Sequence, residues 1–482
     1  MLFNSGKFII FFPIVVSLYY ILPARTKHIF LLFASYFFYM CWNVKYSLIL
    51  LFSTLITYIG AIIVERYRKK GLVALFIILN LSILLYFKYI NFFIQVLTEI
   101  AGRLGINLEI PVFDLILPVG ISFYTFQALG YLIDVYRRKI DAEHDLLRYA
   151  LFVSFFPQLV AGPIERSGHL LKQLSVPQKF DPDNIRNGLL TMIWGFFLKL
   201  VIADRCSVLV NTVYSSYTEY SGIQLVMANV LFALQIYCDF MGYSVIAKGA
   251  SAMLGIDLID NFRQPYFATS IKDFWKRWHI SLSTWFLDYL YIPLGGNRCS
   301  RGRKYFNLFV TFLVSGLWHG AAYTFVIWGM LHGFYQMIED LLTAPANRLT
   351  RLFHIKADAL PWKLFAAVKT FILTDIAWIF FRAESLVAAL YILRQSFMLG
   401  NINLLFGDGI YKLGLNTRNM NILLIALIPL LICGLLRERG TDVRSWILKK
   451  NVILRYAMYW AALILIILSL DITGQEFIYF QF

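Results

Sequence analysis

Charged residues are scarce in this chain. Aspartate, glutamate, lysine and arginine make up only 15% of its 482 residues, whereas 59% are hydrophobic and 17% aromatic. Soluble domains carry about 25% charged residues, so this composition excludes an ordinary water-soluble globular protein. The net charge of +16 would suggest nucleic-acid binding only if the cations shared a soluble face. Because the chain is so apolar, we do not expect it to form such a soluble basic face, and we expect no nucleic-acid partner.

Cysteines, flexible linkers and internal repeats are also lacking. The five cysteines are scattered and form no CxxC pair, so neither a disulfide framework nor a metal site is predicted. Without a Ser/Pro-rich linker, the simplest description is one membrane domain over residues 1–482. Within it we expect N-terminal helical hairpins at 1–136, a core at 146–340 and C-terminal helices at 363–482. The absence of a repeat counts against transporters built from two related halves.

Long apolar runs are what the chain has in abundance. They approach the ~20 residues that a spanning helix needs, and the clearest are Phe8–Leu22, Tyr46–Val64, Leu72–Tyr86, Leu115–Ile133, Asn421–Leu436 and Tyr456–Leu470. With less regular runs between Leu146 and Met398, they predict an all-α polytopic membrane protein with about 11 transmembrane helices. The first run is expected to be an uncleaved helix rather than a signal peptide, because Leu22-Pro23-Ala24 is a poor cleavage site.

The cations cluster in short loops, which indicates the orientation in the membrane. Such loops mark the cytoplasmic side, and here they are 66–70, 137–139, 298–304 and 437–450. Counting spans outward from these loops places both termini on the extracytoplasmic side. We therefore expect a multi-pass protein of the plasma or inner membrane.

A histidine interrupts one of the apolar stretches. Between Phe306 and Tyr335 no Asp, Glu, Lys or Arg occurs, yet His319 lies in the middle. A titratable group in hydrocarbon usually faces a bundle interior or a watery cavity and marks function, although it can also be a satisfied core group. A neutral imidazole there could act as a general base, and no GxSxG or cysteine nucleophile accompanies it. His332 would be rotated by about 220° on a continuous helix, so we expect a structural role for it.

A basic and aromatic segment precedes that stretch. Ser270 and Asp273 form a pattern like a capping box, and a helix starting there would place Lys272, Lys276 and His279 on one face. Interleaved tryptophans are typical of an interfacial or re-entrant helix. The alternative is a peripheral helix that only anchors the protein. Residues 293–297, Pro-Leu-Gly-Gly-Asn, are then expected to break the chain in a tight turn.

Further polar residues lie in apolar surroundings. They are Lys199 and Asp204, Gln235 and Asp239, and Asp375 and Arg382. Each could belong to a structural intramembrane pair or to a polar tunnel, and Asp239 is the best candidate for the tunnel. The segment FFPQLVAGPIER, residues 155–166, is expected to be a broken helix end.

Together these motifs resemble the membrane-bound O-acyltransferase family, most closely its alginate O-acetyltransferase-like bacterial branch. The resemblance lies in FPQLVAGPIER (156–166), QIYCDFMGYSVIAKG (235–249), DFWKRWHISLSTWFLDYLYIPLGGNR (273–298), SGLWHGAAYTFVIWGMLHG (315–333) and AWIFFRAES (377–385). It implies a helical bundle around a central tunnel that the acyl donor enters from the cytoplasm. It also implies that His319 is the catalytic residue and that His279 lies at the active centre.

The same resemblance sharpens the remaining expectations. We expect donor or substrate contacts from Lys276, Arg277, Trp275, Trp278, Asp239, Gln235, Asn297 and Trp318. The PLGGNR continuation favours polysaccharide O-acetylation over D-alanyl transfer to teichoic acid, whose proteins lack it. One departure concerns Val245, where relatives usually carry an acid, and it puts any role of that position in doubt.

The sequence thus predicts an acyltransferase that moves an acyl group, expected to be acetyl, toward an extracytoplasmic polysaccharide. The donor would be acetyl-CoA or another acyl thioester, with no bound cofactor. Expected partners are the bilayer, the polysaccharide acceptor and a membrane-tethered extracytoplasmic acetyltransferase- or esterase-like protein. The alternatives are D-alanyl transfer, a proton-coupled transporter or channel using His319, Asp239 and Asp375, and a scaffold for polysaccharide export.

Overall fold

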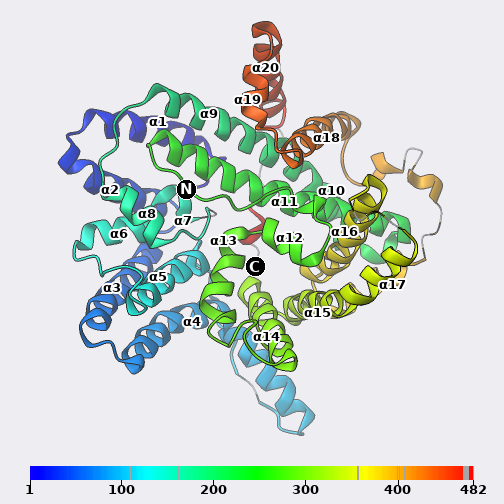
Figure 1. The fold of residues 1–482 in the computed structure, drawn as a ribbon, viewed down its shortest axis with the longest axis horizontal. Coiled ribbons are helices and arrows are strands. Elements are labelled where there is room, and N and C mark those ends of the chain that lie inside the picture. The colour runs from blue at the N-terminus through cyan, green and yellow to red at the C-terminus, as the bar shows by residue number, and fades with distance from the viewer. Residues whose placement is uncertain are drawn as a thin grey trace. The chain divides into compact units, whose positions relative to one another are not determined.

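The computed structural model describes every residue except 109, 161, 355, 357, 399, 401, 406–408, 471–476 and 481–482. Throughout the described residues the regular elements are helices (Figure 1). The predicted all-α class is therefore confirmed. By their contacts the residues form two units, one of 1–192 with 244–259 and the other of 193–243 with 260–482.

The first unit holds the N-terminal helices. They are α1 (Gly6–Ile21), α2 (Lys27–Met40), α3 (Val44–Tyr67), α4 (Lys70–Arg103), α5 (Ile121–Tyr136), α6 (Leu146–Ser154), α7 (Phe156–Leu159), α8 (Ser167–Leu174) and most of α9 (Pro182–Phe196). The C-terminal end of α11 (Gly222–Met253) also belongs to it. The predicted break around residues 155–166 is confirmed, since α6 ends at Ser154 and α7 is a single turn.

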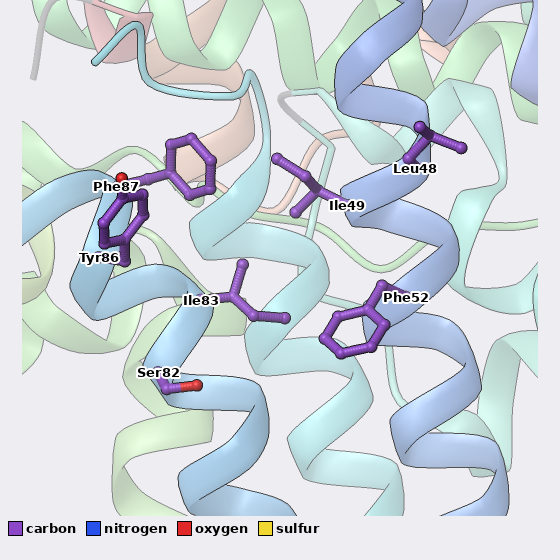
Figure 2. A pocket seen from close by; sticks show the side chains of 7 residues that line it. All are labelled: Leu48, Ile49, Phe52, Ser82, Ile83, Tyr86 and Phe87. Carbon is purple, nitrogen blue, oxygen red and sulfur yellow. The ribbon is translucent and has the colours of Figure 1, made fainter. Parts of the chain in front are cut away.

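Helices α3 and α4 illustrate the hairpins of this unit. The Asn43 side chain accepts the Lys45 N–H at the start of α3, and α3 ends at Tyr67, followed by Arg68 in the left-handed region with φ 52°. Asn80 of α4 donates to the Ser53 hydroxyl of α3 at 2.9 Å. Apart from such contacts α4 is largely exposed, since only 17% of its most apolar stretch is buried. A cavity of about 410 Å³ between the two helices is lined almost wholly by apolar side chains (Figure 2). The outer faces of this hairpin thus suit contact with lipid.

The second unit holds the remaining elements. They are the π-helix η2 (Phe197–Ala203), α10 (Asp204–Ser215), the first part of α11, α12 (Ile271–Arg277), α13 (Ile280–Phe286), the π-helix η5 (Leu287–Tyr291), α14 (Arg301–His319), α15 (Tyr323–Leu352), α16 (Leu360–Arg382), α17 (Leu386–Ser396), α18 (Thr417–Glu438), α19 (Val443–Leu448), α20 (Val452–Ile467) and the 3₁₀ turn η8 (Ile478–Phe480). Short 3₁₀ turns join several of them.

Helices α14 and α15 pack closely through glycine. A Cβ on Gly316 would meet the Phe325 carbonyl oxygen, and one on Gly329 would meet the Phe312 carbonyl oxygen. Small residues let membrane helices approach in this way. The approach holds the last turn of α14, and with it His319, against α15.

Among the described residues, α3, α4, α11, α16 and α18 are long and apolar enough to cross a membrane. Shorter apolar helices of 10–17 residues are α1, α17 and α20. Multiple apolar helices are thus confirmed, whereas the count of about 11 remains a prediction. The expected extracytoplasmic side of both termini likewise remains a prediction.

Candidate active site

The segment that carries His279 is two short helices rather than one. Ser270 caps α12 as predicted, because its hydroxyl accepts the Asp273 N–H at 3.0 Å. Helix α12 ends at Arg277, and His279 has φ 42°, in the left-handed region. The prediction that Lys272, Lys276 and His279 share one helix face is therefore wrong.

Residues outside the helices explain this break. The Ile280 N–H donates to the Asn261 carbonyl at 2.9 Å, and the Ser281 hydroxyl donates to the Asn261 side chain at 2.7 Å. The Arg263 N–H donates to the Arg277 carbonyl oxygen at 2.9 Å. The backbone groups freed at the break are thus satisfied by the segment at 261–263. The strained φ of His279 is held by these bonds, which is a common arrangement at functional sites.

His279 lies in an aromatic environment. It is fully buried, with its ring centroid 4.7 Å from that of Phe240 and 5.9 Å from that of Trp318. Helices α12 and α13 are not among the helices long and apolar enough to cross a membrane. Burial lowers the pKa of the His279 imidazole to about 3. The ring is therefore neutral at physiological pH and keeps the lone pair that a general base needs.

His319 lies next to His279. It is the last residue of α14 and only 3% exposed, and the two imidazole centroids are 6.5 Å apart. Trp328 at 4.9 Å and Phe381 at 5.3 Å flank the His319 ring. The structure thus brings together the two histidines that the sequence singled out.

A third side chain, Tyr479, lies beside the two histidines, and no motif in the sequence predicted a role for it. Its ring centroid lies 5.7 Å from that of His319 and 6.3 Å from that of His279. The Ile478 N–H donates to an Asp239 carboxylate oxygen at 2.8 Å, and this bond fixes the segment. The only signal in the sequence is the aromatic run Phe477-Ile-Tyr-Phe480 after the last apolar helix.

Asp239 also belongs to a buried cluster of charges. The Lys199 ammonium lies 2.7 Å from the Asp204 carboxylate and 2.8 Å from that of Asp239. Gly242 makes room for this region, since a Cβ there would lie 3.0 Å from the Gly195 carbonyl oxygen. The predicted Lys199–Asp204 pair is therefore present. Asp239 is engaged by Lys199 and Ile478, and its expected contact with substrate remains a prediction.

The other predicted contact residues differ in their surroundings. Trp318 neighbours both imidazoles, and Gln235 is buried with its side-chain oxygen unpartnered among the described residues. Trp278 is fully buried and stacks on Phe274. Their expected contacts with substrate remain predictions.

The remaining predicted contacts lie at the ends of this segment. Arg277 pairs with Asp273 at 3.0 Å and Glu438 at 2.6 Å, while Lys276 is exposed. Exposed Asn297 accepts the Tyr291 hydroxyl at 2.6 Å. It belongs to the predicted tight turn, where Gly295 and Gly296 have φ of 117° and 53°.

The structure also bears on two further expectations. Asp375 and Arg382 share α16, and of the two alternatives for them the direct pair does not form, because Asp375 accepts from Asn229 at 2.7 Å and Arg382 donates to Asn211 at 2.7 Å. His332 does not share a continuous helix with His319, since α14 ends before α15 begins.

His332 nevertheless has a structural partner. Its Nδ1 lies 3.2 Å from the Trp275 indole nitrogen and accepts its hydrogen. This bond ties α12 to α15 and orients the Trp275 side chain. In the part of the chain that the structure describes, no cluster of His, Cys, Asp and Glu could hold a metal ion.

Comparison with known proteins identifies the family. Residues 137–381 match the sequence profile of the membrane-bound O-acyltransferases. The probable alginate O-acetylase AlgI of Pseudomonas aeruginosa is 39% identical over 83% of this chain and 75% of its own length. The peptidoglycan O-acetyltransferase of Helicobacter pylori is 36% identical over 84% and 81%. The chain belongs to the membrane-bound O-acyltransferase family.

A more distant relative is named for a different activity. The teichoic acid D-alanyltransferase of Bacillus subtilis is 28% identical over 51% of this chain and 66% of its own length. This membrane-bound O-acyltransferase therefore matches the O-acetylating relatives over more of its length. Both His279 and His319 fall within the profile match, whereas Tyr479 lies beyond its end.

Proposed function

We propose that the protein transfers an acetyl group from a cytoplasmic acyl thioester toward a hydroxyl group of an extracytoplasmic cell-surface polysaccharide. The observation that carries this proposal is the pair of buried imidazoles, 6.5 Å apart, in an O-acyltransferase. Relatives named for O-acetylation of alginate and of peptidoglycan support the acetyl group and the polysaccharide. These relatives are named for different polymers, so the proposal extends to the class of acceptor and no further.

In this proposal His319 is the general base. An imidazole nitrogen takes the proton of the attacking hydroxyl as its oxygen bonds to the acyl carbon. The carbon–sulfur bond then breaks, and the departing sulfur receives the proton from the imidazolium. A water-poor aromatic site favours this route, because a neutral ring there keeps its lone pair. No net charge accumulates over the whole transfer.

His279 has a different proposed role. It orients or polarises the donor carbonyl, and its rigid backbone would hold the ring in place. The Tyr479 ring neighbours both imidazoles, so it limits the space in which the acyl group must fit. The exposed ammonium groups of Lys272 and Lys276 are available to the donor's phosphates or to lipid headgroups.

The proposal includes a location and partners. A plasma or inner membrane location with both termini outside follows from the basic loops. The acyl group would reach the polymer with the help of a membrane-tethered extracytoplasmic acetyltransferase- or esterase-like protein. Acetyl-CoA or another acyl thioester would supply it as a substrate.

The test compares acetylation of the exported polysaccharide between wild type and His319→Ala at equal membrane expression. Loss of a general base reduces transfer by about 10²–10⁴-fold. Exposed His354 offers a control, and His354→Ala should retain the wild-type level. Mass spectrometry of the acyl group released from the polymer distinguishes acetyl from D-alanyl.

Two outcomes would contradict the proposal. Unchanged acetylation in His319→Ala would remove the base from the mechanism. Loss of polymer export itself, rather than of its acetylation, would favour a transporter or an export scaffold.

A further inference from the structure

A second cavity, in the first unit, has a different character from the apolar one between α3 and α4. Its volume is about 300 Å³, at the lower end of the range for small-molecule sites. It lies where α1 turns into α2, and residues 173–177 and α6 complete its wall. Four basic side chains line it, namely Arg25, Lys27, His28 and Arg148, and no carboxylate does. The cavity is therefore a concave surface with an excess of positive charge.

Lys27 is the fixed member of this group. Its residue is only 8% exposed, and its ammonium donates to the Gln178 carbonyl at 2.8 Å. The same ammonium lies 4.8 Å from the Tyr19 ring and 5.3 Å from the Tyr20 ring. These contacts hold the charge in position, yet none of its partners among the residues that the structure describes is an anion. A buried cation without a counter-charge is unfavourable, and an anion in the cavity would relieve that cost.

Arg25 and Arg148 provide charge at the mouth. Arg25 is exposed on the α1–α2 connection and has no acidic partner among the described residues. Arg148 pairs with Asp145 at 3.2 Å, but its side chain remains 41% exposed. Two guanidinium groups on different segments can donate hydrogen bonds to different oxygens of one anion. Phosphate is the common biological group with that geometry.

We propose that this cavity binds a phosphate group, held by Lys27 at its base and by Arg25 and Arg148 at its mouth. The α1–α2 connection is expected on the cytoplasmic side, where basic pockets between membrane helices meet anionic lipid headgroups. A phosphate of a soluble molecule, such as coenzyme A, presents the same chemistry. The two sources differ only in whether the phosphate arrives from the bilayer or from solution.

The test uses the full chain in nanodiscs and three forms of the protein. The pocket variant is Arg25→Gln/Arg148→Gln. The control is Lys69→Gln/Lys70→Gln, which removes the same charge from exposed positions expected on the same membrane side. Phosphatidylcholine nanodiscs are compared with discs that also contain phosphatidylglycerol, and with phosphatidylcholine discs to which inorganic phosphate or coenzyme A is added. Thermal unfolding midpoints and native mass spectrometry report binding.

Phosphatidylglycerol should raise the unfolding midpoint of wild type and control and should bind the pocket variant about tenfold more weakly. That result supports the proposal with a lipid as the source. The same pattern with inorganic phosphate or coenzyme A supports it with a soluble source. Equal losses in the pocket variant and the control would overturn it, as would the absence of any shift in wild type. Arg25→Gln alone, with about a threefold loss, guards against a folding defect in the double variant.

Discussion

Helices α3 and α4 bury polar side chains very differently from the region of η2, α10 and α11. By exposed surface, the buried polar residues of the α3–α4 hairpin are neutral, namely Ser47, Ser53, Thr54, Thr57 and Asn80, and the lysine in the middle of α4, Lys88, keeps part of its surface exposed. In the other region they include Lys199, Asp204, Arg205 and Asp239. Hydroxyls in a helix can satisfy themselves on the preceding turn, as Thr54 does on the Leu50 carbonyl. Charges need one another, and here they fix the segment that carries Tyr479.

The difference indicates how each region contributes to the protein. Neutral pairs hold two long helices together at a small gain per bond. A buried cluster of charges contributes little to the net stability of the fold, but removing one of its members is strongly destabilising. Such clusters are retained where a precise geometry is required, and this one is one bond away from the candidate active site. Four variants can break or sharpen this comparison.

Lys199→Met should have the largest effect. It leaves the Asp204 and Asp239 carboxylates buried without their cation, which costs about 3–5 kcal/mol in the free energy of unfolding. SDS-induced unfolding of the purified protein in mixed micelles measures this change. Lys199→Met/Asp204→Asn/Asp239→Asn removes the charges together and should recover most of the loss. A triple variant as unstable as the single one would show that charge balance is not what Lys199 provides.

His279→Gln should reduce activity rather than stability. The expected loss in acyl transfer is about 10²-fold, because a preorganised group near the reacting carbon is removed. The matched variant is His332→Gln, which also changes a buried histidine and can still accept the Trp275 indole hydrogen. It should keep most of the activity. If both variants lose activity equally, the distinction between a functional and a structural histidine fails.

His319 and His279 also show how far the sequence could go. Their selection rested on local features, namely an ionisable residue in an apolar run and a dense motif. The boundaries of α3 were similarly predictable, as 46–64 against the observed Val44–Tyr67, because hydropathy is a local property.

The break at His279 and the position of Tyr479 could not be predicted in this way. The first depends on bonds to Asn261, 20 residues from Ser281. The second depends on a bond between residues 239 apart in the sequence. Periodicity carries no information about such partners, so the helix through His279 was predicted as continuous and Tyr479 was overlooked.

Asn80→Leu should have a moderate effect in the α3–α4 hairpin. It removes the bond from Asn80 to the Ser53 hydroxyl, and such bonds in membrane proteins contribute about 0.6–1.7 kcal/mol. Ser53→Ala tests the same bond from the other side, and the two losses should not add in the double variant. The same unfolding assay measures all three. A loss as large as that of Lys199→Met would contradict the contrast between neutral and charged burial.

The smallest effect should be a dependence of stability on pH that arises from His169 of α8, a helix that is not among those able to cross a membrane. The His169 ring lies 2.9 Å from the Glu165 carboxylate, and this hydrogen bond raises the pKa of His169 above its usual value. Protonated His169 is therefore favoured in the folded state. The stabilisation is complete below the unfolded pKa of about 6.5 and disappears as the pH rises through the higher folded pKa.

Because the His169 side chain is 38% exposed, solvent should limit this contribution to less than about 1 kcal/mol. Unfolding measured from slightly acidic to slightly alkaline pH should show the decrease in wild type and a flatter profile in His169→Gln. The exposed His354→Gln should retain the wild-type slope. A slope that persists in His169→Gln would assign the titration to another group and would show that protonation of His169 does not contribute to stability.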